Sequence, residues 1–395
     1  MMKIVFFISI HRHGRGGHAH SLNHISREIG KHNEVKIISI GPGKSNIIEA
    51  NPYFHKHLYF NGLNVFNIKR ELEVLKTEFK PNIYHCFDVG SYNVIRLFVS
   101  SKKNKIVLNK CGGPNPTKYR FPFVYNLVLF SLENKSWFEN NSKFRNTFIS
   151  LIPNRVQEIS HDPDFHPIEK QPKDFNFVRI CRIGNTYKKS INDSINLIES
   201  LLQKGFKNVK LYIIGVVEDK FIYDELKQNN LVKYGEVVIL TDTNYTTEAS
   251  KMLYLADAII GTGRGLMESS SLSKPVLAID KNGDLPVLLD EINFEDAFKT
   301  NFSERNVFSN TKFEKNLNNV IKLITDEVYY SEISTFSKSC FDKFFDLEKV
   351  TQYYIKAYNN SVFGNRKLLS DLPLILLNLI SYYRSSKKNK RAIKL

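Results

Sequence analysis

Residues 256–280 read ADAIIGTGRGLMESSSLSKPVLAID, and this stretch indicates the fold class. An apolar, β-rich run ends at Gly261, and a helical pattern follows closely, over Leu266–Leu272. A second apolar run begins at Pro275 and reaches Asp280. A strand, a tight turn, a short helix and another strand in this order are typical of a β-α-β unit with parallel strands.

The glycines between this strand and its helix indicate a ligand site. Gly261, Gly263 and Gly265 bring a helix N-terminus directly behind a strand, where backbone N–H groups and the helix dipole bind phosphate or sugar oxygens. Arg264 can add a bidentate contact to a phosphate. Glu268, one turn later, can accept hydrogen bonds from two vicinal hydroxyls. The alternative is that the glycines only permit a tight turn.

The same alternation of strands and helices extends along the chain. Its 395 residues are enough for about two domains with cores of their own. Near-continuous apolar strands suit parallel sheets that are covered on both faces, so we predict two Rossmann-like, doubly wound domains. The expected N-terminal domain spans residues 1–165, and a proline-punctuated linker covers its end at 154–175. A second domain would span 170–345, followed by a C-terminal helix at 346–360 and a basic amphipathic tail at 361–395.

Composition limits the classes of binding partner and the cellular compartment that we expect. The net charge of +16 favours polyanions such as phosphates, nucleic acid or an anionic membrane face. We expect no nucleic-acid partner, because no helix-turn-helix, RNA-binding aromatic motif or zinc finger is present. The four cysteines are far apart, which favours a reducing cytoplasm. The apolar run Ile4–Ile10 reads as a first strand rather than a signal peptide, and no run approaches the ~20 apolar residues of a membrane span.

Several motifs together resemble a known family. Glu268-(x)6-Pro275-Val276, preceded by Ala-Asp-Ala, resembles the donor-sugar segment of retaining glycosyltransferases of family four, also called group 1. Other pieces occur in that family's order: Gly16-Gly17, Cys181-Arg182-Ile183 with Lys188-Lys189, and Leu211 to Gly215. The resemblance spans roughly residues 3 to 358, and an ordered set of motifs is far more specific than any one of them.

The resemblance implies a fold and an activity. The fold would be GT-B, with two Rossmann-like domains facing a cleft, an N-terminal one for the acceptor and a C-terminal one for the donor. The reaction would transfer a sugar, with retention of configuration, from a nucleotide-diphosphate sugar to a saccharide or lipid-linked saccharide in cell-surface polysaccharide biosynthesis. A UDP-sugar is the favoured donor, and neither a metal ion nor another cofactor is expected.

The resemblance also implies roles for particular residues. Arg182 with Lys188 or Lys189 would hold the diphosphate and neutralise its charge as it leaves, although a solvated basic loop is the alternative. Glu268 would bind the ribose hydroxyls. Arg264 would bind the sugar or the β-phosphate together with backbone amides. His85 or Asp88, at the end of a strand, would contact the acceptor or donor sugar, and these two residues with Arg264 are the catalytic candidates. For His85 the alternative is a histidine that is merely satisfied at a strand end. The remaining expected donor-binding residues are Gly16, Gly17, Gly215, Gly263, Gly265 and Leu266.

Two departures from the family pattern keep other functions open. Ile260 stands where the family often has a second glutamate, and Phe87 stands where it often has a second histidine. A non-catalytic nucleotide- or glycan-binding protein on the same scaffold is therefore one alternative, and a sugar-nucleotide epimerase is another. A zinc site among the histidines of residues 11–20 is disfavoured, because no cysteine or paired carboxylate completes a ligand set.

The C-terminal segment allows two interpretations. Leu368–Tyr383 followed by six lysines and arginines reads as an amphipathic helix with a polybasic end. Such a helix favours peripheral contact with an anionic inner membrane, at about 1 kcal/mol per cation. The alternative is a disordered, solubilising tail.

Overall fold

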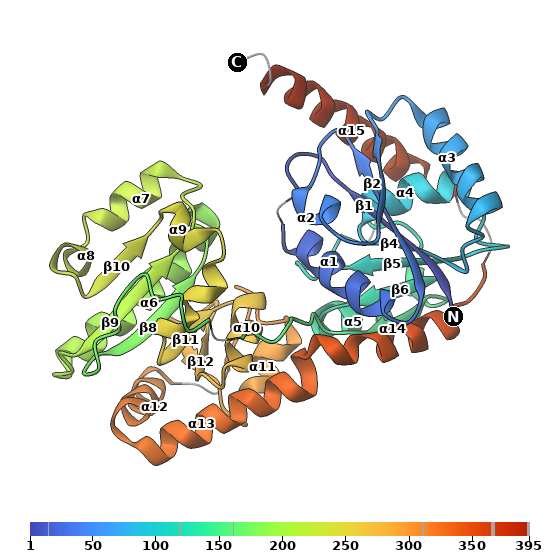
Figure 1. Ribbon diagram of the computed structural model, residues 1–395. Helices are drawn as coiled ribbons and strands as arrows, with labels where there is room; N and C mark the ends of the chain where they lie inside the picture. The colour runs from blue at the N-terminus through green and yellow to red at the C-terminus, as the bar shows by residue number, and fades with distance from the viewer. Residues whose placement is uncertain (15, 118–119, 161, 310–311, 365–367, 393–395) are drawn as a thin grey trace. The chain divides into compact units, whose positions relative to one another are not determined.

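The computed structural model describes residues 1–14, 16–117, 120–160, 162–309, 312–364 and 368–392 (Figure 1). The chain forms two compact units. Unit 1 comprises Met1–Arg155 together with Leu347–Leu395, and unit 2 comprises Val156–Asp346. The chain therefore leaves unit 1 once and returns to it for its last fifty or so residues.

Unit 1 contains a seven-stranded sheet in which all neighbouring strands are parallel. The spatial order is β3-β2-β1-β4-β5-β6-β7, so the direction of winding reverses between β1 and β4. Buried apolar residues dominate the central strands, as expected for a sheet covered on both faces. The strands are β1 (Lys3–Ser9), β2 (Glu34–Gly41), β3 (Phe54–Tyr59), β4 (Ile83–Cys86), β5 (Lys105–Lys110), β6 (Asn126–Leu129) and β7 (Phe148–Leu151).

Helices cover both faces of this sheet (Figure 1). Phe6 belongs to an apolar cluster shared with α1 and α14, whereas its neighbour Phe7 belongs to a cluster shared with α3, α4 and α15. This division follows from the alternation of side chains along a strand. The helices are α1 (Gly17–Gly30), α2 (Asn46–Glu49), α3 (Val65–Glu78), α4 (Val89–Phe98), α5 (Leu132–Glu139), α14 (Val350–Asn359) and α15 (Leu372–Ala392), with 3-10 turns at Ser142–Phe144, Leu347–Lys349 and Leu369–Asp371.

Unit 2 contains a six-stranded sheet in the order β10-β9-β8-β11-β12-β13. Here the winding reverses between β8 and β11. All pairs are parallel except β12 with β13. The strands are β8 (Phe175–Ile180), β9 (Val209–Ile214), β10 (Val237–Leu240), β11 (Ala258–Gly261), β12 (Val276–Ala278) and β13 (Val287–Leu288).

The helices of unit 2 also lie on both faces of its sheet. Phe177 packs in a cluster with α6 and α12, and the adjacent Val178 packs in a cluster with α10 and α13. The helices are α6 (Lys188–Gln203), α7 (Lys220–Lys227), α8 (Asn230–Tyr234), α9 (Thr243–Thr246), α10 (Arg264–Ser271), α11 (Phe294–Lys299), α12 (Phe313–Thr325) and α13 (Glu327–Cys340), with 3-10 turns at Asn185–Tyr187 and Ala249–Leu255 and a π turn at Phe341–Phe345.

The prediction of two doubly wound domains is confirmed, with one exception in the sheets. The antiparallel edge strand β13 departs from the expected all-parallel pattern. The connection from β12 to β13 spans residues 279–286 and contains no helix. A parallel return needs a longer crossover, so this short loop brings the chain back antiparallel.

The unit boundaries differ from those expected at residues 165, 170 and 345. Val156 already pairs with Asp346, and Ile159, Phe165 and Ile168 pack on the core of unit 2, so most of the expected linker belongs to that unit. The final residues belong to unit 1 because α14 and α15 insert buried tyrosines into its cores. Residues 365–367 and 393–395 of the expected tail lie outside the described residues.

Candidate functional site

The candidate site lies at the point in unit 2 where the winding of the sheet reverses. Strands β8 and β11 are neighbours there, and the chain leaves their carboxyl ends toward opposite flanks of the sheet. In open α/β sheets this reversal separates the loops and leaves a crevice in which ligands bind. The loop after β8 carries Arg182, and the loop after β11 carries Gly263. The two most informative sequence motifs therefore follow adjacent strands.

Gly263 turns the chain from β11 into α10. Its φ of +54° and ψ of −127° lie in a region that favours glycine, and its N–H donates to the carbonyl of Phe302 over 2.6 Å. Helix α10 begins at the next residue, so the amides of Gly265 and Leu266 belong to a first helical turn without intrahelical acceptors. The Leu266 side chain is buried in the core, and only its backbone can serve a ligand.

Arg264 and Glu268 form an ion pair along α10. Arg264 Nη2 lies 2.8 Å from Glu268 Oε1, and the side chains are 19% and 20% exposed. Arg264 Nη1 is buried and has no hydrogen-bond partner among the described residues. A buried guanidinium donor without an acceptor costs free energy, and a bound anion would relieve that cost. The start of α10 therefore combines a helix N-terminus with an unsatisfied cationic donor.

Arg182 and Lys188 flank the same crevice from the other side. Arg182 Nη1 lies 2.6 Å from Glu218 Oε1, and its Nη2 donates to the Tyr187 hydroxyl over 3.1 Å. Lys188 Nζ lies 2.7 Å from Glu225 Oε2. All four charged side chains are more than a third exposed. Exposed ion pairs contribute little to stability, so these cations can change partners at low cost.

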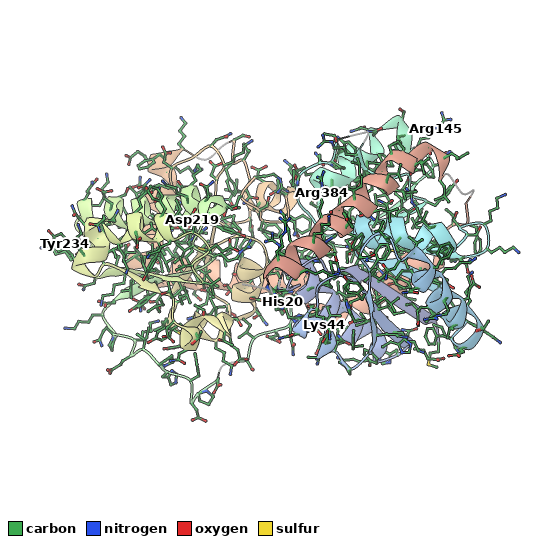
Figure 2. All side chains as sticks on the ribbon, turned by 90° about the horizontal axis from the view of Figure 1, so that it is seen from above. His20, Lys44, Arg145, Asp219, Tyr234 and Arg384 are labelled. Carbon is green, nitrogen blue, oxygen red and sulfur yellow. The ribbon has the colours of Figure 1, made fainter. Side chains whose placement is uncertain are left out.

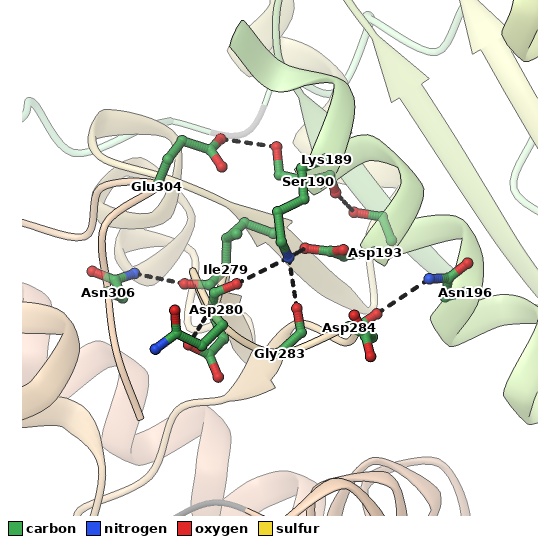
Figure 3. Close-up of polar contacts among 12 residues, drawn as sticks. Lys189, Ser190, Asp193, Asn196, Ile279, Asp280, Gly283, Asp284, Glu304 and Asn306 are labelled. Atoms are coloured by element: carbon green, nitrogen blue, oxygen red, sulfur yellow. Dashed lines mark hydrogen bonds and ion pairs between the residues drawn. The ribbon is translucent and has the colours of Figure 1, made fainter. Parts of the chain in front are cut away.

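Lys189 has a different environment from Lys188, and Figure 3 shows the contacts of Lys189. Its Nζ donates to Asp193 Oδ2 over 2.6 Å, to the Gly283 carbonyl over 2.6 Å and to the Asp280 carbonyl over 3.2 Å. Burial raises the pKa of Asp193, and the bond from Lys189 opposes that shift. Lys189 thus ties the start of α6 to the loop after β12. The sequence left the two lysines equivalent, whereas the contacts make Lys188 the better candidate for a ligand.

Sequence reasoning missed a buried polar cluster behind these loops. Arg179, in β8, is fully buried and donates from Nη2 to Ser190 Oγ over 2.5 Å. Ser190 Oγ lies 2.9 Å from Glu304 Oε1, a pair that Figure 3 shows. Burial raises the pKa of Glu304, while Arg179 lowers it. The cluster fixes α6 against the 303–306 loop. An arginine inside an apolar strand was the only sequence signal for it.

Gly215 has a packing reason to be glycine. A Cβ at this position would lie 1.7 Å from the carbonyl oxygen of Cys181, because the ends of β8 and β9 approach closely. This contact explains the residue without a ligand. Its expected donor-binding role stays a prediction.

Unit 1 reverses its winding between β1 and β4, and the expected residues of that unit follow these strands. Gly16 is the N-cap of α1, and a Cβ on Gly17 would meet no atom within 4 Å. Asp88 caps α4: its Oδ1 accepts from the Ser91 amide over 2.8 Å and from Ser9 Oγ over 2.6 Å, and its Oδ2 accepts from the Ser9 amide over 2.7 Å. These contacts assign Asp88 a structural role and argue against a sugar contact.

His85 is a core residue, and we withdraw it as a catalytic candidate. Its side chain is fully buried against Phe6, Phe87, Tyr354 and Tyr358. Nδ1 lies 2.8 Å from the Tyr358 hydroxyl, and burial lowers the pKa of the imidazole to about 3. The expectation failed because the side chain points onto the face of the sheet covered by α14, not past the end of β4.

The described part of the chain contains no cluster of three or more histidine, cysteine, aspartate or glutamate side chains that could hold a metal ion.

Comparisons with solved structures identify the fold. HepE from Anabaena, in complex with UDP and glucose, superimposes with a TM-score of 0.60 at 14% identity, covering 91% of this chain and 100% of HepE. A glycosyltransferase from Rickettsia africae gives 0.62 at 14% identity, covering 90% and 98%. The pneumococcal O-GlcNAc transferase GtfA, in complex with UDP and GlcNAc, gives 0.58 at 9% identity, covering 91% and 99%. The chain has the GT-B fold.

At the level of sequence, no family model and no curated protein matches the chain.

Proposed function

We propose that this protein is a glycosyltransferase that moves a sugar from a nucleotide-diphosphate sugar to a saccharide or lipid-linked saccharide. Unit 2 would bind the donor, with a UDP-sugar favoured, and unit 1 would bind the acceptor. The observation that carries the proposal is the start of α10, which combines helical amides without intrahelical acceptors and an Arg264 whose Nη1 has no partner among the described residues. The complexes of HepE and GtfA with UDP support the choice of donor.

The cations would act on the leaving diphosphate. Arg264 would bind a phosphate oxygen through Nη1, with the Gly265 and Leu266 amides beside it. Arg182 and Lys188 would exchange Glu218 and Glu225 for the diphosphate, whose oxygens suit both a bidentate guanidinium and a lysine ammonium. Negative charge grows on the diphosphate as the bond between it and the sugar breaks. Fixed cations at that position stabilise the transition state more than the ground state.

Glu268 would hold the ribose through its second carboxylate oxygen while Oε1 remains with Arg264. The pair then couples recognition of the nucleoside to recognition of the phosphate. Retention of configuration, independence from metal ions and a place in cell-surface polysaccharide assembly are parts of the same proposal, and they rest on the sequence resemblance.

The experiment that tests the activity is incubation of the purified chain with UDP-, GDP- and ADP-sugars, with and without a lipid extract as acceptor. Release of nucleoside diphosphate is measured by chromatography, and the sugar is analysed by NMR. We expect release from one donor class, at least tenfold slower in Arg182→Ala and Arg264→Ala.

A matched control is Lys204→Ala, which removes an exposed cation from the opposite end of α6 and should leave the release unchanged. Conversion of the donor to an epimer without acceptor would favour the epimerase alternative. Binding of a donor without release or conversion would favour the non-catalytic alternative.

A further inference from the structure

Helix α15 is firmly anchored on unit 1 through its inward face. The Tyr382 hydroxyl lies 2.6 Å from Ser9 Oγ, and its ring stacks on His11 with centroids 4.6 Å apart. Asn389 donates to the carbonyl of His11 over 2.9 Å. Figure 2, in which Arg384 is labelled, looks down on this helix where it lies across unit 1. The described part of the tail therefore forms a helix that packs on unit 1.

The beginning of the helix is anchored as well. Asp371 Oδ2 lies 2.7 Å from Arg96 Nη1, and this ion pair is almost completely buried. The same oxygen accepts from the Phe123 amide over 2.7 Å. Gly62 adopts a φ of +84°, and a Cβ there would lie 2.2 Å from the Leu379 carbonyl oxygen. Such close packing means that the outward face of α15 is presented in a fixed orientation.

That outward face begins with exposed apolar side chains. Leu376 and Leu377 are 50% and 60% exposed, and Leu369, in the preceding turn, is 89% exposed. These residues recur at helical spacing, so they form one continuous stripe. We call it the apolar stripe, and its members are Leu369, Leu372, Leu376, Leu377, Ile380 and Tyr383.

The stripe runs directly into a basic segment. The sequence contains no aspartate or glutamate after Asp371. The exposed cations form no ion pair within the described part of the chain, although Lys387 Nζ lies 4.7 Å above the Tyr383 ring. Leucines, then an aromatic ring, then cations match the layers of an anionic bilayer surface. The cations are Arg384, Lys387, Lys388, Lys390 and Arg391.

We propose that the outward face of α15 docks on the surface of a bilayer that contains anionic phospholipids. The apolar stripe enters the boundary between headgroups and acyl chains, and the basic segment binds headgroup phosphates. None of the described helices is long and apolar enough to cross a membrane. The contact is therefore peripheral, with α15 lying along the surface. This proposal does not depend on the proposed transferase activity.

Docking through α15 would also have a consequence within unit 1. His11 follows β1 and precedes the loop that leads to Gly16 and α1. Because the inward face of α15 contacts His11, the same helix would join the lipid surface to the loop at the winding reversal of unit 1. A lipid-linked acceptor held in that surface would arrive beside this loop.

The experiment is flotation of the full-length protein with vesicles of phosphatidylcholine alone or of phosphatidylcholine with about one third phosphatidylglycerol. We expect binding only with phosphatidylglycerol. Lys387→Gln with Lys388→Gln should weaken partitioning about 20- to 30-fold, from about fivefold per cation. Leu376→Ser with Leu377→Ser should weaken it about tenfold or more.

Two matched controls test whether binding depends on this face of α15 or on any exposed apolar or cationic side chain. Phe66→Ser removes a 77% exposed aromatic ring from α3. Lys102→Gln with Lys103→Gln removes two exposed cations from the loop after α4. Both controls should bind like the wild type, and all variants should keep the wild-type melting temperature because every altered side chain is exposed.

Three results would overturn the proposal. The first is failure of the wild type to float with phosphatidylglycerol vesicles. The second is an equal loss of binding in the controls. The third is a dimer in light scattering that the leucine variant abolishes while no protein floats, because a second copy would then be the occupant of the stripe.

Discussion

Gly215, Gly263 and Gly265 are glycines for different reasons. A Cβ on Gly215 would collide with the backbone of Cys181, and Gly263 needs its positive φ. Neither reason applies to Gly265, which lies in a helix with open space around its missing Cβ. We propose that a ligand approaches the first turn of α10 closely at this position.

Gly265→Ala should therefore separate stability from binding. Alanine is the better helix former by up to about 1 kcal/mol, so the melting temperature should stay level or rise. Binding of UDP should weaken at least tenfold, because the new methyl group would stand where phosphate oxygens approach the amides. Melting curves and calorimetric titration check the two effects. Unchanged affinity would remove the helix start from the site.

The burial of His85 predicts a pH dependence of stability. The pKa of this imidazole falls from 6.5 to about 3 on folding, so the unfolded chain binds a proton more readily between these values. The contribution of this group to the free energy of unfolding is fully present above about pH 6.5 and is lost as the pH falls toward 3. For one such group, the loss between pH 7.5 and pH 5.5 is about 1.4 kcal/mol.

The comparison is urea unfolding of the wild type and of His85→Phe with Tyr358→Phe, which removes the imidazole and its hydroxyl partner together. The other titrating groups are common to both proteins. Between pH 7.5 and pH 5.5 we expect the wild type to lose about 1.4 kcal/mol more free energy of unfolding than the double variant. Parallel curves for the two proteins would contradict the burial of His85.

The sequence could suggest some residues of the candidate site but not others. Arg182, Arg264 and Glu268 could be proposed from the sequence because they follow strand ends, where loops of a parallel sheet converge, and their roles stay predictions. His85 was misplaced because a residue within a strand points onto a face that the sequence does not identify. Glu304 was missed because its partner Arg179 is 125 residues away in the chain.

At the level of elements, the docking of α15 on unit 1 includes one very close backbone contact, at Gly62. Replacement of Gly62 by alanine would place a Cβ 2.2 Å from the Leu379 carbonyl oxygen, at a positive φ that alanine disfavours. We expect the helix to separate from unit 1 without global unfolding, because the sheet and the other helices keep their cores. Hydrogen exchange should show faster exchange in α15 than in α4 or β1.

The control is Gly17→Ala, because a Cβ at Gly17 would meet no atom within 4 Å. This variant should leave hydrogen exchange in α15 unchanged. Equal exchange in Gly62→Ala and the wild type would show that α15 does not need the close contact. Much of the alternation of strands and helices followed from hydrophobic period, although β3 and β6 were not predicted. Strand β13 and the docking of α15 did not follow from it, because loop length and a distant partner decide them.

At the scale of the molecule, the sequence could predict two doubly wound units and their order. It could not assign residues 347–395 to unit 1, because that choice depends on Tyr354, Tyr358 and Tyr382 finding cores formed more than 200 residues earlier. Each unit places its informative loops at its winding reversal, and this shared arrangement underlies the proposed division into donor and acceptor binding.

The most direct test of the donor site is calorimetric titration of the full-length protein with UDP, GDP and ADP and with their monophosphates. We expect one nucleoside diphosphate to bind, with its monophosphate at least tenfold weaker. Arg264→Ala and Glu268→Gln should each weaken that binding at least tenfold, while Lys204→Ala should bind like the wild type. Absence of binding by every nucleoside diphosphate at millimolar concentration, or full affinity in Arg264→Ala, would contradict a diphosphate site at the start of α10.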